Sequence, residues 1–376
     1  MVAMATASCA GATSIHAAPP TRLSAFAARP VASATVQPAA ARAPTTQPPI
    51  PACVATLTPE AKASQLLMAL VPEPAAAGDL VASGKIGGYA LTGDQQGDLR
   101  AAIAAITPKS KLPLLVSGDE EGGTVQRLRA VLGLLPSAAK MASNGSPTQA
   151  GSRFATYAHK MADLGFAMNL GPSLDVGGGS GLASRSFGND VAKVSAYGNA
   201  VIAGVREAGL VPVAKHWPGI GGGTADPHTG ASPVASIDQL RTRDLVPFDR
   251  AIAAGVPAIM VSHAAIPGLT NGVPASLSKV AITGELRGRE HFDGLVVTDS
   301  LGMGAVSDQK LGNAEAAVVA IEAGADIALI SDPKYVADAH RRLVAAIASG
   351  GLPAAQLDRS VARVLLVKGV SGACPP

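Results

Sequence analysis

Residue types that serve in acid–base and nucleophilic chemistry are concentrated in the range Leu210–Gly230, which reads LVPVAKHWPGIGGGTADPHTG. The apolar start of this stretch suits a buried parallel strand, which would end at Lys215 and His216. The glycines that follow are too dense for a helix or a strand and suit a mobile loop, which delivers Asp226 and His228. A cation and an imidazole at a strand end, with a carboxylate and a second imidazole on a loop, suit a site for a sugar or an acyl group. A glycine-rich surface turn with incidental histidines is the alternative interpretation.

Polar side chains also follow apolar runs elsewhere in the chain. Asp119, Asp175, His263 and Asp299 each come after such a run, as Lys215 and His216 do. In a barrel of parallel strands, the carboxyl ends of the strands form the active-site face. A lone Asp after a strand is usually a helix cap or a turn residue, but five strands that end in this way favour a shared functional rim.

Short apolar runs and amphipathic helical patterns alternate from Leu57 onward, which predicts a parallel sheet. The expected strands are Leu66–Val71, Ile86–Leu91, Leu114–Gly118, Ala167–Leu170, Val211–Lys215, Ala258–Ser262, Leu295–Thr298 and Ile327–Ile330. The expected helices are Leu99–Ile106, Gln149–Leu164, Ala192–Ala208, Leu240–Ala254, Ala314–Ala323, Tyr335–Ser349 and Ala355–Lys368. Eight strands favour a closed (β/α)8 TIM-type barrel over an open doubly wound sheet.

The composition agrees with one large α/β domain. Hydrophobic residues make up 48% of the 376 positions and the mean hydropathy is +0.29, so a large core is available. The net charge of +3 is small and scattered, which excludes nucleic acid as an expected partner. No apolar run approaches the roughly 18 residues of a membrane span.

The first 52 residues differ from the rest because they are rich in Ala, Pro, Thr and Ser and contain no acidic residue. We expect residues 1–52 to be a signal remnant and a disordered linker, and residues 53–376 to be the catalytic domain. Small residues before Cys9 resemble the end of a lipoprotein signal, although Thr6 stands where Leu is usual. We therefore expect a start upstream of Met1, a lipid on Cys9 and attachment to a membrane; an ordinary disordered tail is the alternative.

The other two cysteines flank the expected domain. Cys53 precedes its first helix and Cys374 lies two residues from the last residue of the sequence. Because TIM-type barrels bring their ends together, a disulfide between them is expected if the protein is exported. Both cysteine arguments favour an extracytoplasmic location.

Six short motifs follow one another along the chain in a defined order. They are Ser117–Leu128 (SGDEEGGTVQRL), Asn169–Val176 (NLGPSLDV), Arg185–Gly188 (RSFG), Lys215–Gly219 (KHWPG), Asp226–His228 (DPH) and Gly294–Gly304 (GLVVTDSLGMG). In this order they resemble glycoside hydrolase family 3, and specifically its single-barrel β-N-acetylglucosaminidase branch. The resemblance extends from about Leu57 to the last residues and implies one barrel, without the second α/β domain that glucosidase members usually carry.

The resemblance implies a role for each catalytic residue. Asp299 corresponds to the family's nucleophile, which forms a covalent glycosyl-enzyme in a retaining mechanism. His228, paired with Asp226, corresponds to the unusual acid/base of this branch. A histidine suits that role because its ordinary pKa, about 6.5, lies near neutral pH.

The resemblance also implies a set of sugar-binding residues. Asp119 would accept hydrogen bonds from ring hydroxyls, and four cationic or imidazole side chains would donate to the hydroxyls and the N-acetyl group: Arg127, Arg185, Lys215 and His216. Buried cations without such partners would be costly, although an internal pair of Lys215 and His216 with Asp175 is an alternative. Glu120 and Glu121 are adjacent on a strand, so at most one can face the site.

No cofactor and no metal are expected. His263 either lines the pocket or is a satisfied core residue, and three further histidines, His159, His291 and His340, are expected at the surface. The usual metal-binding spacings of His and Cys are missing. The Gly177–Gly181 run lacks the ending of a phosphate-binding loop.

The sequence departs from the family pattern at two places near the catalytic residues. Ile220-Gly221-Gly222 stands where a polar run such as His-Gly-Asp is common, and Ser300 stands where a second Asp is frequent. Neither change removes a catalytic group, so they bear on rate and aglycone preference.

The sequence thus predicts a monomeric, retaining exo-β-N-acetylglucosaminidase that acts on terminal β-linked GlcNAc. By resemblance, the expected substrates are peptidoglycan fragments (muropeptides). A GlcNAc phosphorylase remains open, because a histidine acid/base repels phosphate less than a glutamate does. A broader β-glucosidase of the same family is a further alternative. A non-catalytic surface glycan-binding protein is the alternative from another class.

Overall fold

The eight predicted strands form one parallel sheet that closes into a barrel. The computed structural model describes residues 49–179, 181–223 and 234–375. The strands are β1 (Leu67–Val71), β2 (Gly88–Leu91), β3 (Leu115–Gly118), β6 (Met168–Asn169), β7 (Val211–Trp217), β8 (Ala258–Val261), β9 (Leu295–Thr298) and β10 (Ala328–Ile330), in the order β10-β1-β2-β3-β6-β7-β8-β9. A parallel bridge between Val297 and Ile327 joins β9 to the start of β10 and closes the circle. The predicted TIM-type (β/α)8 fold is confirmed.

Alternation along the strands separates an inner layer from an outer layer. Met68, Leu115, Met260 and Leu329 belong to the cluster that fills the barrel. Their chain neighbours, such as Leu67 and Val116, belong to the larger cluster between the sheet and the helices. This division follows from the two-residue period of a strand, in which successive side chains point to opposite faces.

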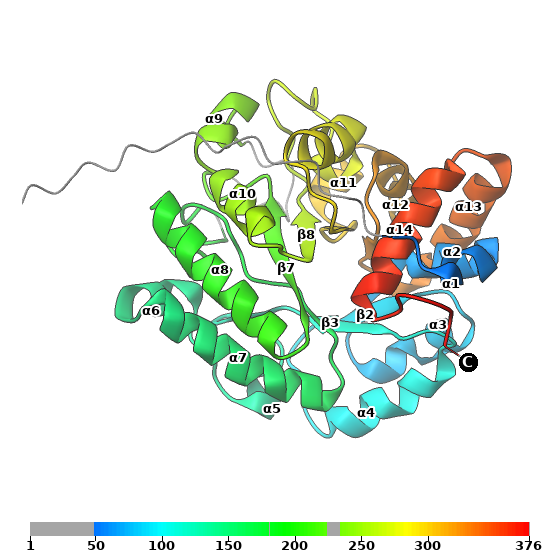
Figure 1. Ribbon diagram of the computed structural model, residues 1–376, viewed down its shortest axis with the longest axis horizontal. Helices are drawn as coiled ribbons and strands as arrows, with labels where there is room; N and C mark the ends of the chain where they lie inside the picture. Colours follow the sequence, from blue (N-terminus) through cyan, green and yellow to red (C-terminus); the bar gives the residue numbers. More distant parts are fainter. Residues whose placement is uncertain (1–48, 180, 224–233, 376) are drawn as a thin grey trace, which may run out of the picture. The chain divides into compact units, whose positions relative to one another are not determined.

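Most of the predicted helices occur at the expected places. These are α4 (Leu99–Ile106), α7 (Pro147–Leu164), α8 (Val191–Glu207), α12 (Asn313–Ala323), α13 (Val336–Ser349) and α14 (Ala354–Val367). Helices α7 and α8 pack side by side over one flank of the barrel (Figure 1).

The single helix predicted over Leu240–Ala254 is wrong. The structure has two helices there, α9 (Ile237–Thr242) and α10 (Val246–Ala253). Pro247 lies in the first turn of α10. In a continuous helix its ring would clash with the carbonyl of Arg243, whereas at a helix start it is tolerated.

Several short elements have too little periodicity to be predicted from sequence. They are the helices α1 (Ala52–Thr56), α2 (Pro59–Gln65), α3 (Gly78–Ala82), α5 (Arg129–Leu132), α6 (Ala138–Asn144) and α11 (Gly304–Ser307), the π-helix Val280–Arg289, the 3₁₀ turns Pro74–Ala77, Thr107–Lys109, Ala275–Leu277 and Pro333–Tyr335, and the strands β4 (Glu120–Gly122) and β5 (Val125–Gln126). The antiparallel β4–β5 pair directly follows β3. Its turn contains Gly122 and Gly123, both with positive φ, which glycine adopts without strain.

The two ends of the described chain meet beside α14 (Figure 1). Cys53 and Cys374 form a disulfide across 321 positions of sequence. The backbone N–H of Cys53 also donates to the carbonyl of Gly372. In the part of the chain that the structure describes, no helix is both long enough and apolar enough to cross a membrane.

Candidate active site

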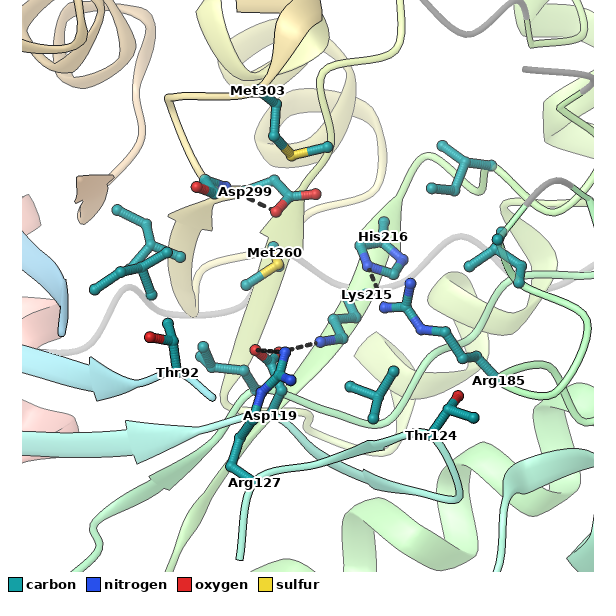
Figure 2. Close-up of a pocket in the computed structure, with 18 residues that line it drawn as sticks. Thr92, Asp119, Thr124, Arg127, Arg185, Lys215, His216, Met260, Asp299 and Met303 are labelled. Atoms are coloured by element: carbon teal, nitrogen blue, oxygen red, sulfur yellow. Dashed lines mark hydrogen bonds and ion pairs between the residues drawn. The ribbon is translucent and has the colours of Figure 1, made fainter. Parts of the chain in front are cut away.

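A pocket of about 460 Å³ opens at the carboxyl ends of the barrel strands. It is lined by six of the predicted site residues: Asp119, Arg127, Arg185, Lys215, His216 and Asp299 (Figure 2). They come from β7 and from the segments after β3, β5, β6 and β9, so only the closed barrel brings them together. The predicted acid/base pair, Asp226 and His228, and the predicted lipid site, Cys9, lie outside the described residues.

The apolar part of the pocket was not predicted. Its side chains include Leu70, Leu170, Met260 and Leu329, which lie at or near the carboxyl ends of four strands. The sequence does carry a signal for them, because each is an apolar residue close to the last position of a predicted strand.

Lys215 is held between two carboxylates. Its Nζ lies 2.6 Å from Asp119 Oδ1 and 2.7 Å from Glu121 Oε1, and its side chain is 2% exposed. Burial acts to lower the pKa of Lys215, but the charges of Asp119 and Glu121 outweigh it and raise the pKa above its ordinary value. Lys215 therefore remains a cation inside the pocket.

Glu121 is the centre of this charged network. Besides Lys215, it accepts two hydrogen bonds of 2.8 Å from Arg185 Nε and Nη2. Burial acts to raise the pKa of Glu121, but Lys215 and Arg185 together hold it far below its ordinary value. Lys215 and Arg185 therefore do not need a bound sugar to balance their buried charges, because the protein supplies the carboxylates itself. The sequence-based expectation that such cations would be costly without a substrate is wrong on this point.

Glu120 points away from this network, as the alternation of a strand requires. Its Oε1 accepts the backbone N–H groups of Arg127 (2.7 Å) and Leu128 (3.0 Å), and its Oε2 accepts the hydroxyl of Tyr157 (2.7 Å). Burial raises the pKa of Glu120 to about 7. Only one of the two adjacent glutamates, Glu121, therefore joins the cations of the pocket.

Arg127 is less completely paired than the other two cations. Its Nη2 lies 3.6 Å from Asp119 Oδ2. Its buried Nε has no hydrogen-bond partner among the described residues. A buried donor of this kind is costly until a ligand or a water accepts from it.

His216 forms the predicted pair with Asp175, but Lys215 does not. His216 Nδ1 lies 2.7 Å from Asp175 Oδ2, and Arg185 Nη2 lies 3.1 Å from His216 Nε2. Because a guanidinium can only donate, Nε2 must accept, which assigns the proton of the neutral ring to Nδ1.

Asp299 stands on the opposite side of the pocket from this network (Figure 2). Its backbone N–H donates to the carbonyl of Val261 on the neighbouring strand (2.9 Å), which fixes its position. Its Oδ1 accepts the N–H of Ser300 at 2.7 Å. Burial acts to raise the pKa of Asp299, but the imidazoles of His216 and His263 and the N–H of Ser300 outweigh it, so the pKa lies below its ordinary value. An ionised carboxylate is therefore available in the pocket at neutral pH.

Two other histidines are structural. His263 is 1% exposed and is bound to Ser276 Oγ and to the carbonyl of Ser300, so it is a satisfied core residue behind Asp299. His340 was expected at the surface, but it is 3% exposed and contacts Ser64 Oγ and the carbonyl of Glu60. Among the residues described, no group of three or more His, Cys, Asp or Glu side chains could hold a metal ion.

The glycines after His216 have a use that the sequence did not reveal. Gly221 and Gly223 are buried. A Cβ on Gly221 would lie 2.5 Å from the carbonyl oxygen of Val176, and Gly179 donates its N–H to the carbonyl of Gly221 (3.0 Å). These glycines allow two backbones to approach closely, a role that the prediction of a mobile loop did not include.

Comparison with known proteins gives one consistent result. A family model described as the glycosyl hydrolase family 3 N-terminal domain matches residues 58–367. A β-hexosaminidase named LpqI from Mycobacterium tuberculosis (strain ATCC 25618 / H37Rv) is 39% identical over 334 residues, which cover 85% of each chain. The solved structure of M. tuberculosis LpqI is 38% identical with a TM-score of 0.79, and the match covers 86% of this chain and 99% of that one. A family 3 β-N-acetylglucosaminidase from Paenibacillus sp. str. FPU-7 is 32% identical with a TM-score of 0.79, over 84% of this chain and 63% of that one.

Proposed function

The chain belongs to glycoside hydrolase family 3, and we propose that it is a retaining exo-β-N-acetylglucosaminidase. The observation that carries the proposal is the pocket itself, which has a volume of about 460 Å³ and is lined both by Asp299 and by a cluster of side chains that are able to hydrogen-bond to hydroxyl groups. Such a cavity has the size range of sites that enclose one small ligand. The names of the relatives, β-hexosaminidase and β-N-acetylglucosaminidase, support the choice of sugar.

Asp299 is the proposed nucleophile. Its lowered pKa keeps it ionised, and its fixed place at the end of β9 lets a carboxylate oxygen attack the anomeric carbon of a bound sugar. The glycosidic bond then breaks with the leaving-group oxygen protonated, and a glycosyl-enzyme ester forms on Asp299. Water attacks the same carbon in the second step, which restores the carboxylate and gives net retention.

His228 and Asp226 are the proposed acid/base pair. The proposal rests on the resemblance of Asp226–His228 to the family motif, since both residues lie outside the described part of the chain. His228 would give a proton to the leaving group in the first step and take one from water in the second. Asp226 would orient its ring, as a carboxylate does in a catalytic triad.

The charged network is proposed to bind the hydroxyl and N-acetyl groups of the sugar. Asp119 has acceptor capacity left beyond its contacts with Lys215 and Arg127, so it can accept from ring hydroxyls. The unpartnered Nε of Arg127 is a donor available to the sugar. Arg185, Lys215 and His216 already bond to carboxylates and to one another, which preorganises them before substrate arrives.

We further propose that the protein acts outside the cytoplasm on GlcNAc-containing fragments of peptidoglycan. The disulfide between Cys53 and Cys374 supports an oxidising location. One relative, 31% identical over 309 residues, is described as a secreted glycosyl hydrolase, and another carries the name LpqI. Lipidation of Cys9 and a monomeric state are parts of the same proposal.

The test is release of p-nitrophenol from its β-GlcNAc glycoside, with the β-glucoside as control. Wild type should act on the GlcNAc substrate, and Asp299→Ala should lose at least about a thousandfold in kcat, since removing a nucleophile eliminates the covalent step. Equal rates on both sugars would indicate a broader β-glycosidase. Binding of GlcNAc without turnover would indicate a glycan-binding protein, and GlcNAc 1-phosphate formed only in phosphate buffer would indicate a phosphorylase.

A further inference from the structure

One buried carboxylate connects the sugar-binding network to the segment that leaves the pocket. Asp175 is fully buried, and its Oδ2 accepts from Ser173 Oγ (2.8 Å) and from His216 Nδ1 (2.7 Å). Its Oδ1 accepts the backbone N–H of Ile220 at 2.8 Å. Ile220 itself lines the pocket. Asp175 is not among the residues that line the pocket, so its influence on the site passes through its partners.

The hydrogen bond between Asp175 and His216 determines which ring nitrogen carries the proton and which one can accept a hydrogen bond at the pocket. With Nδ1 donating to Asp175, Nε2 accepts from Arg185 (Figure 2). Arg185 is in turn bidentate on Glu121. If the proton moved to Nε2, two donors would face each other and the contact between His216 and Arg185 would be lost.

The bond to Ile220 is reinforced by backbone packing immediately after Asp175. Val176 contacts Gly221 so closely that no Cβ fits between them. A Cβ on Gly179 would lie 2.6 Å from the carbonyl oxygen of Gly223. The carboxylate and the packing surface thus belong to one short segment, which holds residues 220–223 in place.

We propose that Asp175 is a positioning residue that holds His216 in its Nδ1–H tautomer facing Arg185 and anchors Ile220 at the edge of the pocket. It acts through His216 and Ile220 on binding of the sugar. This inference rests on the proposed function for its kinetic consequence, but the tautomer of His216 can be measured without any substrate.

The variant Asp175→Asn tests the role because an amide cannot replace both functions. The amide oxygen can accept from either His216 or Ile220, and the NH₂ group then faces a donor at the other position. If His216 changes tautomer to accept from that NH₂, it loses Arg185. Either arrangement disturbs one end of the connection between the network and residues 220–223.

A matched control is Asp244→Asn. Asp244 is also a buried carboxylate near this segment, packed against Gly219, but it is bonded to Arg243 instead of to His216 or Ile220. We expect Asp175→Asn to raise KM for the p-nitrophenyl GlcNAc glycoside at least about tenfold, with a smaller change in kcat, because a hydrogen bond to a charged group is lost from the binding network. Asp244→Asn should leave KM within about twofold of wild type.

The second measurement is ¹⁵N NMR of histidine-labelled wild type, with the His216 signals assigned by their loss in His216→Gln. The proposal requires a protonated Nδ1 and an unprotonated Nε2 in wild type, and loss of this pattern in a folded Asp175→Asn. A wild-type ring protonated on Nε2 would overturn the proposal even if the variant did not fold. An unchanged KM and an unchanged tautomer in folded Asp175→Asn would also overturn it, while wild-type activity would leave the proposed function intact. An inactive wild type with the Nδ1–H pattern would count against the proposed function alone.

Discussion

Three carboxylates in or next to the pocket, Glu121, Asp119 and Asp299, differ in how completely the protein satisfies them. Glu121 is paired with Lys215 and twice with Arg185. Asp119 contacts Lys215 and, more distantly, Arg127. Asp299 accepts one backbone N–H and, among the described residues, forms no ion pair. This gradient agrees with the proposed roles, in which Glu121 is structural, Asp119 binds the sugar and Asp299 attacks it.

Glu121→Gln should therefore be costly in stability as well as in activity. It leaves Lys215 and Arg185 buried with less negative charge, and breaking a buried ion pair costs about 3 kcal/mol or more. We expect a clear loss in the free energy of unfolding and a fall in kcat/KM of at least about tenfold. The control is Glu120→Gln, which changes the adjacent residue outside the network and should cost less than about 1 kcal/mol at pH 7. Equal effects of the two variants would contradict the assignment.

The pH dependence of the same control tests the raised pKa of Glu120. Folding raises this pKa from an ordinary value near 4.5 to about 7. The folded state then binds more protons than the unfolded state between these values, so the contribution of Glu120 is complete below pH 4.5 and is lost as the pH rises through 7. Thermal melts should show wild type gaining relative to Glu120→Gln at pH 5 and losing that advantage by pH 8. An unchanged difference in melting temperature would contradict the raised pKa.

At the scale of elements, the site depends on a close approach of two loops. Gly221→Ala would place a Cβ against the backbone of Val176, with its three nearest atoms at 2.5–2.8 Å. The atoms in contact are backbone atoms, so the clash cannot be relieved by a change of side-chain rotamer. We therefore expect a loss of about 1–3 kcal/mol in the free energy of unfolding and a drop in kcat/KM. Gly222→Ala is the matched control, because its nearest neighbour is a side-chain atom of Arg243 at 3.6 Å. If thermal melts and kinetics of the two variants agree, the close packing has no role.

The strands, and many of the polar residues at their carboxyl ends, could be predicted from the sequence for a physical reason. Barrel strands are buried on both faces and appear as continuous apolar runs, and their last residues must converge on one face. The sequence could not show which charged side chains pair with one another. Glu121 was considered only as one of two alternatives, yet it turned out to hold Lys215 and Arg185, because the β4–β5 pair that aims it is too short to predict. Likewise, the Gly221–Gly223 run resembles a flexible segment until its packing against Val176 is known.

At the scale of the whole molecule, closure of the barrel brings distant segments together. β10 pairs with β1, and the disulfide between Cys53 and Cys374 joins the ends of the same domain. Neither cysteine lines the pocket. Removing the disulfide should therefore weaken the fold without a change in the residues that line the pocket.

Cys374→Ser should lower stability by about 2–4 kcal/mol, because a cross-link over a long loop restricts the unfolded chain. Activity well below the melting temperature should stay near that of wild type. Thiol reductant should lower the melting temperature of wild type by a similar amount and leave that of the variant unchanged. A wild-type melting temperature that is insensitive to reductant would show that the disulfide does not contribute.

The central claim is that Asp299 forms the covalent bond to the sugar. The most direct test is mass spectrometry after incubation with a GlcNAc donor that carries an activated leaving group and a fluorine at C5, which slows both steps so that the intermediate accumulates. We expect one added sugar per chain, located on the peptide that contains Asp299 and absent from Asp299→Asn. A sugar attached to another carboxylate, such as Asp119, or continued turnover of the GlcNAc glycoside by Asp299→Asn without labelling, would contradict it.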